Sequence, residues 1–278
     1  MAALPEDGEV IVVDDSSAVP ASEILGPMSS PALKVLTNPE PLGGGGSPSR
    51  NRGAQSARGD VLFFLDDDDE MIAEYCAQIL GAPSQTAAFG FSARLFRSSE
   101  SGGSPTSKVE SRALPDGPIS VDADYAERTF PFSAGFWITR QGYEKAGDFC
   151  ADLATNSDTE YCLRMYSAGL SGWYSATPGV AIDLGDDRAA SQLDNVTRRT
   201  KAGARARAFA AIAARHAEYL QSDLGAAQFV HSRWLKHAIR AGHSETAKEA
   251  IRTAPKQVQN GLRMQYVLKS GFRRLGLG

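Results

Sequence analysis

The feature that most constrains this chain is a run of four aspartates at residues 66–69, directly after the apolar segment 61–65. A short apolar run that ends in polar residues is typical of a buried strand of a parallel sheet that leads into a polar loop. Four neighbouring carboxylates repel one another and raise each other's pKa. A bound divalent cation would relieve this repulsion, because hard cations prefer carboxylate oxygens. The alternative is an acidic loop that caps the next helix, and the run by itself leaves both open.

Strand-like and helix-like segments alternate over the first two thirds of the chain. Apolar and β-branched runs predict strands at residues 9–13, 33–36, 61–65 and 87–96, and a strand or turn at 132–139. Helical spacing predicts helices over residues 54–57, 71–80 and 158–168. The Ser, Gly and Pro content of residues 98–118 predicts a mobile loop. The alternation favours an α/β fold with a mostly parallel sheet flanked by helices, in which ligands bind at the carboxyl ends of the strands.

The charge is divided unevenly, and the division coincides with a change in composition. From Arg198 onward there are 16 Lys and Arg against 4 Asp and Glu, or +12, which leaves 13 against 29, or −16, before it. Ala-rich helices are predicted at residues 204–219, 228–241 and 245–253, with Gly242 as a break. We therefore expect two regions, residues 1–197 and a basic helical region, 198–278. The acidic region would repel nucleic acid, whereas the basic one is either a solvated face or a contact for an anionic membrane.

Cysteine and histidine positions exclude several classes of protein. The three cysteines fit no zinc spacing, and their odd number disfavours a disulfide framework. The four histidines all lie in the basic region, so the acidic one has no imidazole for a Ser-His or Cys-His pair. No segment approaches the roughly 18 apolar residues of a membrane helix. We expect a cytoplasmic protein, with peripheral contact at the inner face of the membrane left open.

Six motifs in the acidic region carry a resemblance to a known family. They are VVDDSS at residues 12–17, SRNRGAQSARGD at 49–60, FFLDDDD at 63–69, SAGFWITR at 133–140, GDF at 147–149 and SDTEYCLR at 157–164. Their order and spacing resemble those of the family 2 glycosyltransferases over residues 9–185. The resemblance implies a Rossmann-like GT-A domain, and an inverting, hexosyltransferase-type enzyme with a nucleotide-sugar donor.

The resemblance implies a donor site built from the first three motifs. By similarity, Asp15 accepts a hydrogen bond from the nucleobase while Asp14 steadies the loop, and both belong to the nucleotide-sugar site. Arg50 and Asn51 are expected near the donor.

The resemblance also implies a metal site in the aspartate run. Asp66 and Asp68 correspond to the family's Asp-x-Asp pair, which holds Mg²⁺ or Mn²⁺ against the donor phosphates, with Asp68 as the direct ligand. Asp67 and Asp69 are expected to cap the next helix or to support the metal ligands.

The later motifs imply the acceptor side of the site. Asp158 corresponds to the family's catalytic base, which takes the proton from the acceptor hydroxyl. The alternative for Asp158 is an N-cap of its helix. Glu160 is expected to orient the acceptor. Trp137 offers a ring on which an acceptor sugar can stack, although core packing explains it equally well.

Two features depart from the family pattern. The family begins with a further strand and helix, and that strand lies in the sheet between the strands at residues 9–13 and 61–65. Its loss would leave unpaired backbone groups, so we expect residues 1–197 to be an N-terminally truncated GT-A domain. Where many members place a metal-binding histidine, this chain has Asp183.

The sequence thus predicts an inverting, metal-dependent transferase that moves a sugar from a donor, expected to be UDP-linked, to a glycan or lipid-linked acceptor in polysaccharide or glycoconjugate synthesis. One alternative is a non-catalytic GT-A-like interaction module. A sugar-nucleotide pyrophosphorylase is a further alternative, but the Gly-rich, basic loop expected after its first strand is missing. Neither the sugar nor the acceptor can be read from the sequence.

Overall fold

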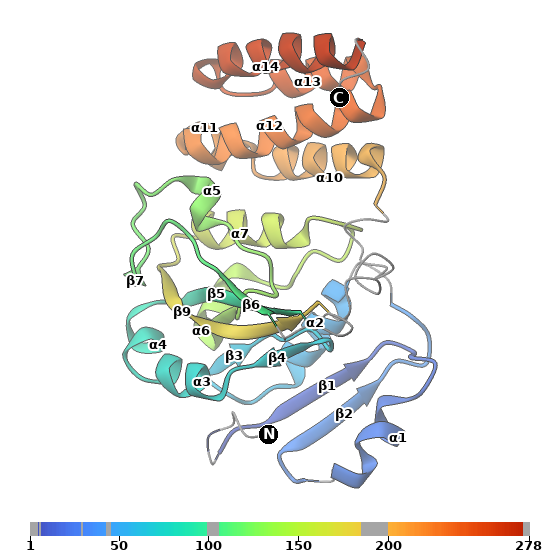
Figure 1. Cartoon of the computed structure of the whole chain (residues 1–278), viewed down its shortest axis with the longest axis vertical. Coiled ribbons are helices and arrows are strands. Elements are labelled where there is room, and N and C mark those ends of the chain that lie inside the picture. Colours follow the sequence, from blue (N-terminus) through green and yellow to red (C-terminus); the bar gives the residue numbers. More distant parts are fainter. Residues whose placement is uncertain are drawn as a thin grey trace.

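The computed structural model describes residues 5, 7–28, 30–42, 46–98, 106–184 and 200–274. It has an α/β part, formed by two sheets and their helices, and a stack of helices above it (Figure 1). The predicted α/β class with helices against the sheets is confirmed. The predicted boundary between residues 197 and 198 lies outside the described residues. No helix among those residues has the length and apolar character needed to cross a membrane.

The smaller sheet contains the first two strands. β1 (Val10–Asp14) and β2 (Leu33–Thr37) pair in parallel, with Val12 opposite Val35. The short α1 (Ala21–Leu25) and the 3-10 turn η1 (Gly26–Met28) connect them. The β-branched sequence predicts a buried strand at β1, but its first four residues are only half-buried. The physical reason is that β1 has a strand on one side only within the described part of the chain.

The larger sheet contains seven strands in the order β3-β8-β5-β9-β4, with β6 beside β5 and β7 beside β9. The strands are β3 (Val61–Phe63), β4 (Asp69–Met71), β5 (Phe89–Ser98), β6 (Thr106–Glu110), β7 (Gly117–Pro118), β8 (Trp137–Thr139) and β9 (Gly172–Asp183). Only the β5–β9 pairing is parallel among those described in this sheet. The parallel share of the fold is therefore smaller than expected, because short strands add to this sheet in antiparallel fashion.

The segment expected to be a mobile loop contains a strand. β6 pairs with β5 from Arg94 opposite Glu110 to Ser98 opposite Thr106, and the Arg94 guanidinium lies 3.0 Å from the Glu110 carboxylate. All five residues of β6 are exposed. Its strand conformation is therefore set by backbone pairing with β5 and not by burial, which explains why its composition suggests a loop.

Six helices accompany the sheets in the described part of residues 46–184. They are α2 (Ser47–Ser56), α3 (Ala73–Leu80), α4 (Ala82–Thr86), α5 (Tyr125–Arg128), α6 (Arg140–Ala146) and α7 (Ser157–Ser167). Between α6, α7 and the sheet lies an aromatic core in which the Phe91 and Phe130 rings, and the Phe149 and Tyr161 rings, are each 4.2 Å apart. The helices predicted at residues 71–80 and 158–168 are confirmed as α3 and α7.

The basic region is helical, as predicted. It contains α10 (Ala202–Arg215), α11 (Ala217–Ser222), α12 (Leu224–Ala241), α13 (Ser244–Arg252) and α14 (Lys256–Arg274). The predicted helix at 204–219 is two helices that meet at His216, and α14 is a helix that the sequence analysis missed. Gly242 ends α12 with φ 79°, a conformation that favours glycine.

The helical region packs tightly on the α/β part. Tyr125, Leu153 and Leu163 share one buried cluster with side chains of α10 and α12 such as Ile212. Arg128 of α5 also forms a buried ion pair of 2.9 Å with Asp223, which is the N-cap of α12. The helices therefore complete a core of the α/β part, and α10, α11 and α12 lie above α5 and α7 (Figure 1).

Candidate active site

The loop after β1 is held in a fixed shape by Asp14. Its side chain is 3% exposed and accepts hydrogen bonds from the backbone N–H groups of Ser17, at 2.8 Å, and Ala21, at 2.9 Å. These bonds hold the pKa of Asp14 below its usual value, because they stabilise the ionised carboxylate. Ser16, which precedes Ser17 in this loop, has the left-handed φ of 66°. Asp14 therefore shapes the loop and is not directed at a ligand.

Asp15, the next residue, joins the ends of β1 and β2. Its Oδ1 accepts hydrogen bonds from the Asn38 side chain, at 2.8 Å, and from the Leu42 N–H, at 2.9 Å. Arg52 of α2 donates to the Thr37 carbonyl and to the Asn38 side chain. No partner within the described residues occupies Oδ2 of Asp15. This oxygen is available to a ligand at the carboxyl end of the small sheet.

Arg50 brings the aspartate run and the start of α7 together. Its guanidinium lies 2.5 Å from the Asp66 carboxylate and 5.0 Å from the centre of the Phe132 ring. It also lies close enough to Asp158 to favour the ionised form of that carboxylate. Arg50, Asp66 and Asp158, which are up to 108 residues apart in the sequence, therefore meet at one place.

Asn51 has a different role from the expected donor contact. Its side-chain amide donates to the Phe149 carbonyl at 2.9 Å and accepts from the Phe149 N–H at 2.7 Å. Both ends of the amide are thereby used to fix α2 against the loop before α7. In this structure Asn51 positions Arg50, its neighbour, instead of facing a donor.

The four aspartates lie in the connection between β3 and β4. Asp67 and Asp68 are exposed at its turn, and the Asp69 N–H donates to the Asp66 carbonyl at 3.2 Å. Burial, followed by the charges of Asp68 and Asp66, raises the pKa of Asp69 to about 6. α3 begins only at Ala73, and its N-cap, Ile72, has no side-chain hydrogen bond. The helix-cap alternative is therefore wrong.

The donor set of this turn suits a hard divalent cation. The side chains of the turn offer carboxylate oxygens, and the raised pKa of Asp69 reflects its burial beside the charges of Asp68 and Asp66, which a cation would offset. No three Asp, Glu, His or Cys side chains converge on a metal position within the part of the chain that is described. These residues fit a cation that is held by one or two carboxylates and completed by donor phosphates, as Mg²⁺ commonly is.

Asp183 lies beside this turn. β4 pairs with β9 so that Asp69 is opposite Ile182, and Asp183 is the next residue along β9. A further carboxylate thus ends the strand that borders the aspartates.

Asp158 lies in the first turn of α7, near the positive end of the helix dipole. The N-cap is Asn156, with φ 62°, so the N-cap alternative for Asp158 is wrong. Burial raises the pKa of Asp158, while the Thr159 N–H, which donates to Oδ1 at 2.7 Å, and the charge of Arg50 act in the opposite direction. A carboxylate with a raised pKa is a stronger base than a free one, which suits proton abstraction.

Glu160 is placed by the structure in a buried ion network. Its side chain is fully buried, with Arg164 paired to both oxygens, Nε2 of His216 at 3.1 Å and Nη1 of Arg215 at 3.6 Å. Burial alone would raise the pKa of Glu160, but the hydrogen bonds from His216 and Arg164 lower it. The expected contact with an acceptor is not supported, because the carboxylate is enclosed by side chains of α7, α10 and the α10–α11 junction.

Trp137 belongs to the core. It is 0% exposed and its ring packs against Gly90, where a Cβ would lie 2.6 Å from the indole. The structure contradicts the acceptor contact predicted for this ring, since no face of it is available to a sugar. The core-packing alternative is correct.

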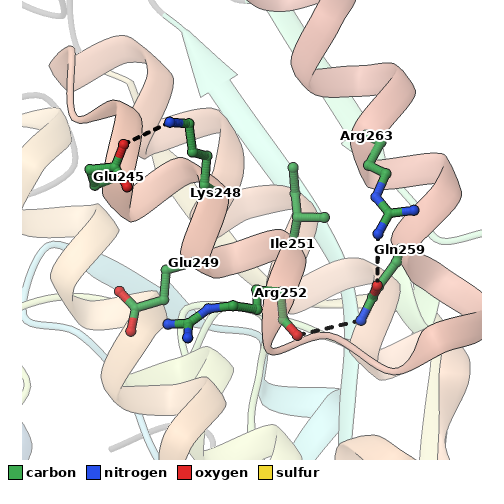
Figure 2. A pocket seen from close by; sticks show the side chains of 7 residues that line it. All are labelled: Glu245, Lys248, Glu249, Ile251, Arg252, Gln259 and Arg263. Carbon is green, nitrogen blue, oxygen red and sulfur yellow. Dashed lines mark hydrogen bonds and ion pairs between the residues drawn. The ribbon is translucent and has the colours of Figure 1, made fainter.

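The hollow between α13 and α14 is separate from these residues (Figure 2). It contains acidic and basic side chains of both helices, among them the Lys248–Glu245 ion pair at 2.7 Å and Arg252. The charges of its lining largely offset one another, so it is not a candidate for the active site.

Comparison with known sequences agrees with the motif order. The sequence profile described as glycosyl transferase family 2 matches residues 2–145, about half of the chain. The chain belongs to this family. A curated family relative from Haemophilus influenzae, described as an uncharacterized glycosyltransferase, is 36% identical over 83 residues. That match spans 30% of this chain and 27% of the relative.

Solved structures share the fold at low sequence identity. Staphylococcus aureus TarS 1-349, crystallised in complex with UDP-GlcNAc, has a TM-score of 0.69 at 14% identity and covers 99% of this chain and 86% of its own. The TarS 1-349 structure without a named ligand has a TM-score of 0.64 and covers 99% of this chain and 85% of its own. The match extends over the helical region as well as the glycosyltransferase part.

One cation near the candidate base of this glycosyltransferase fold has no signal in the sequence. Arg233 of α12 lies within electrostatic range of both Asp158 and Arg112. Its guanidinium also stacks on the Phe229 ring, 3.4 Å from the centre. Arg233 is 75 residues from Asp158, on a helix that carries no family motif, so no local signal connects the two.

Proposed function

We propose that this chain is an inverting, metal-dependent glycosyltransferase that moves a sugar from a UDP-linked donor to a hydroxyl group of a glycan or glycoconjugate acceptor. The supporting observation is the meeting of Arg50 with Asp66 and Asp158. It joins the turn proposed to bind the donor phosphates to the carboxylate proposed as the base. UDP is the nucleotide to test first, since TarS, of the same fold, was crystallised with UDP-GlcNAc.

The proposed donor site extends from β1 to the aspartate turn. Asp15 accepts a hydrogen bond from the base of the nucleotide through its open Oδ2, and Asp14 keeps the loop in shape. Asp68 and Asp66 hold a divalent cation, Mg²⁺ or Mn²⁺, with the donor diphosphate. When bound, that cation supplies charge stabilisation for the leaving nucleoside diphosphate. Arg50 adds a positive charge at the same place.

The proposed chemistry is a single displacement. The Asp158 carboxylate takes the proton of the acceptor hydroxyl while that oxygen forms a bond to the anomeric carbon of the sugar. The bond from this carbon to the donor phosphate breaks on the opposite side, and the anomeric configuration is inverted. Arg50 and the Thr159 N–H favour the ionised form of Asp158, the form that accepts the proton, and so oppose the burial that raises its pKa.

A non-catalytic module is the second candidate, favoured by the separation of β1 and β2 from the larger sheet. A transferase, an interaction module and a sugar-nucleotide pyrophosphorylase, the further alternative from the sequence, differ in their products. Transfer releases UDP from a UDP-sugar, a pyrophosphorylase releases or consumes pyrophosphate, and an interaction module does neither. Assaying both products with UDP-sugars and Mn²⁺ distinguishes the three.

The donor site is tested by calorimetric titration of UDP with and without Mn²⁺. We expect Mn²⁺ to tighten UDP binding about tenfold or more, because a cation held by the aspartates would attract the phosphates of UDP. Asp68→Ala should remove this gain. Asp67→Ala, which takes the same charge from the same exposed turn, should retain most of it. An affinity for UDP that changes neither on addition of Mn²⁺ nor on Asp68→Ala would overturn the proposal.

A further inference from the structure

The central helix of the basic region carries an uninterrupted stripe of cations. Arg233, Lys236 and Arg240 of α12 are spaced three and four residues apart, which places them on one face. α12 contains no Asp or Glu. Arg233 and Lys236 are half-buried and Arg240 is exposed. These three residues are called the basic stripe.

Neighbouring helices add further positive charge to the basic stripe. α10 and α14 both pack on α12. Burial and then the charges of Arg240, Lys269, Arg233 and Arg205 lower the pKa of Lys236. On the same helix, burial and then the charges of Arg205, Lys236, Arg240 and Arg233 lower the pKa of His237 to about 4. The cations are therefore close enough to repel one another.

Within the described residues, the cations of the basic stripe are not paired with carboxylates. Some buried and half-buried arginines elsewhere in the protein are paired with carboxylates, as Arg128 is with Asp223 and Arg164 with Glu160. Arg233, Lys236, Arg240 and Lys269 have no ion pair with a carboxylate among the residues that the structure describes. Like charges that are held together without a counter-charge weaken the fold, so their concentration here indicates an anionic ligand.

The basic stripe leads to the candidate base. Arg233, at one end, lies within electrostatic range of Asp158 and of Arg112. From there Lys236 and Arg240 extend along α12 for about two turns, or roughly 10 Å. A ligand on the stripe would therefore have one end beside Asp158, where the acceptor hydroxyl must lie if the proposed function holds.

We propose that the acceptor is a linear polyanion, a glycan chain with repeated phosphate or carboxylate groups, which lies along Arg233, Lys236 and Arg240 with its reactive hydroxyl at Asp158. This inference rests on the proposed function for the role of Asp158. Arginine and lysine bind phosphate and carboxylate oxygens through charge-assisted hydrogen bonds. Repeated charges along a chain match cations that are repeated along a helix.

A membrane surface fits these observations less well. A flat layer of lipid headgroups contacts cations that are fully exposed, whereas Arg233 and Lys236 are half-buried. Cations from α10 and α14 also flank the basic stripe. Three of the exposed apolar residues of the helical region, Met264, Val267 and Leu268, lie on α14, and Leu224 is the first residue of α12, nine positions before Arg233. Membrane binding is accordingly a competing outcome of the test.

The test measures binding of the whole chain to linear inorganic polyphosphate, to uncharged dextran and to vesicles of phosphatidylcholine with phosphatidylglycerol. The variant is Lys236→Gln with Arg240→Gln, and Arg240→Gln alone serves if the double variant unfolds. The control, Arg207→Gln with Arg252→Gln, removes the same charge from exposed positions of α10 and α13. UDP affinity with Mn²⁺ is measured for every variant.

We expect polyphosphate to bind, dextran not to bind, and the polyphosphate affinity to fall as salt rises. The Lys236 and Arg240 variant should bind polyphosphate about tenfold more weakly and with a smaller salt dependence, whereas the control should change less than about threefold. Equal losses in both variants, or a variant that loses vesicle binding but keeps polyphosphate binding, would overturn the inference. UDP affinity should be unchanged throughout; its absence in the wild type would instead sink the proposed function.

Discussion

At the scale of single residues, neighbouring carboxylates in this protein have different environments. Asp14 is ionised through backbone hydrogen bonds, whereas Asp15, the next residue, keeps one oxygen open. Asp158 lies by Arg50, and Glu160, two residues later, is enclosed by Arg164 and His216. A carboxylate that is fully paired and buried has no capacity left for a substrate. Of these four, Asp15 and Asp158 have the environments that suit contact with ligands.

The role of Asp158 is tested by Asp158→Asn. The amide has nearly the same shape but cannot take a proton, so we expect the transfer rate to fall by about a hundredfold or more, with UDP affinity unchanged. In the wild type the rate should rise with pH through the pKa of Asp158, which burial raises above its usual value, because only the ionised form acts as a base.

The control for this measurement is Asp122→Asn, at an exposed position of the chain. Equal rates for Asp158→Asn and the wild type, or a rate that is greatest in acid, would show that Asp158 is not the base.

At the scale of elements, the position of α7 is set by both parts of the protein. Its Glu160 carboxylate accepts from His216, at the junction of α10 and α11, and lies near Arg215 of α10. Asn51 of α2 holds the loop before α7 through the Phe149 backbone. α7 is thereby fixed at its start by α2 and along its side by the helical region, and Asp158 takes its place from both.

We predict that Glu160→Gln destabilises the protein. The substitution removes the buried carboxylate charge and leaves Arg164, Arg215 and His216 around a neutral amide, with Asp152 as a partner of Arg215 alone. This should lower the free energy of unfolding by about 3 kcal/mol. Urea unfolding at pH 7.5 measures this change. Glu218→Gln, at an exposed position of α11, is the matched control and should change little.

If Glu160 instead binds the acceptor, the free energy of unfolding would be nearly unchanged and the KM for the acceptor would rise. That pair of results would restore the role that the resemblance implies.

At the scale of the whole molecule, the two sheets are not joined by strand pairing within the described residues. The Val10 N–H donates to β2, so the alternating pattern directs the N–H groups of Ile11 and Val13 to the other side. Directly after β3, the Phe64 N–H donates to the Phe136 carbonyl, just before β8. The alternating pattern therefore directs the N–H groups of Val61 and Phe63 away from β8. The truncation inferred from the resemblance is consistent with these two open edges, and it stays a proposal.

Hydrogen exchange tests whether a strand pairs with these edges. We predict fast exchange at Ile11 and Val13 and slower exchange at Val12, whose N–H faces β2. An apolar, strand-forming peptide added in trans should slow exchange at Ile11 and Val13 by about tenfold or more, because paired amides are protected. A scrambled peptide is the control. Slow exchange at both amides without any peptide would contradict the proposal.

The sequence by itself determined the family, the α/β fold class and the local chemistry of each motif. Acidic residues at the ends of β1 and β3, and Asp158 at the start of α7, follow from short segments in which the residue types and their spacing carry the information. Strand and helix signals of this kind depend on neighbours within a few residues. That is why α3 and α7 were predicted closely and β6, which forms only by pairing with β5, was not.

Only the tertiary structure decided which side chains face a ligand. It placed Trp137 and Glu160 in the interior and brought Arg233, from the helical region, near Asp158. Burial and the distance between charges control whether a polar group is a structural partner or a reactive one. Both quantities arise from contacts between segments far apart in the chain, and a linear motif does not contain them.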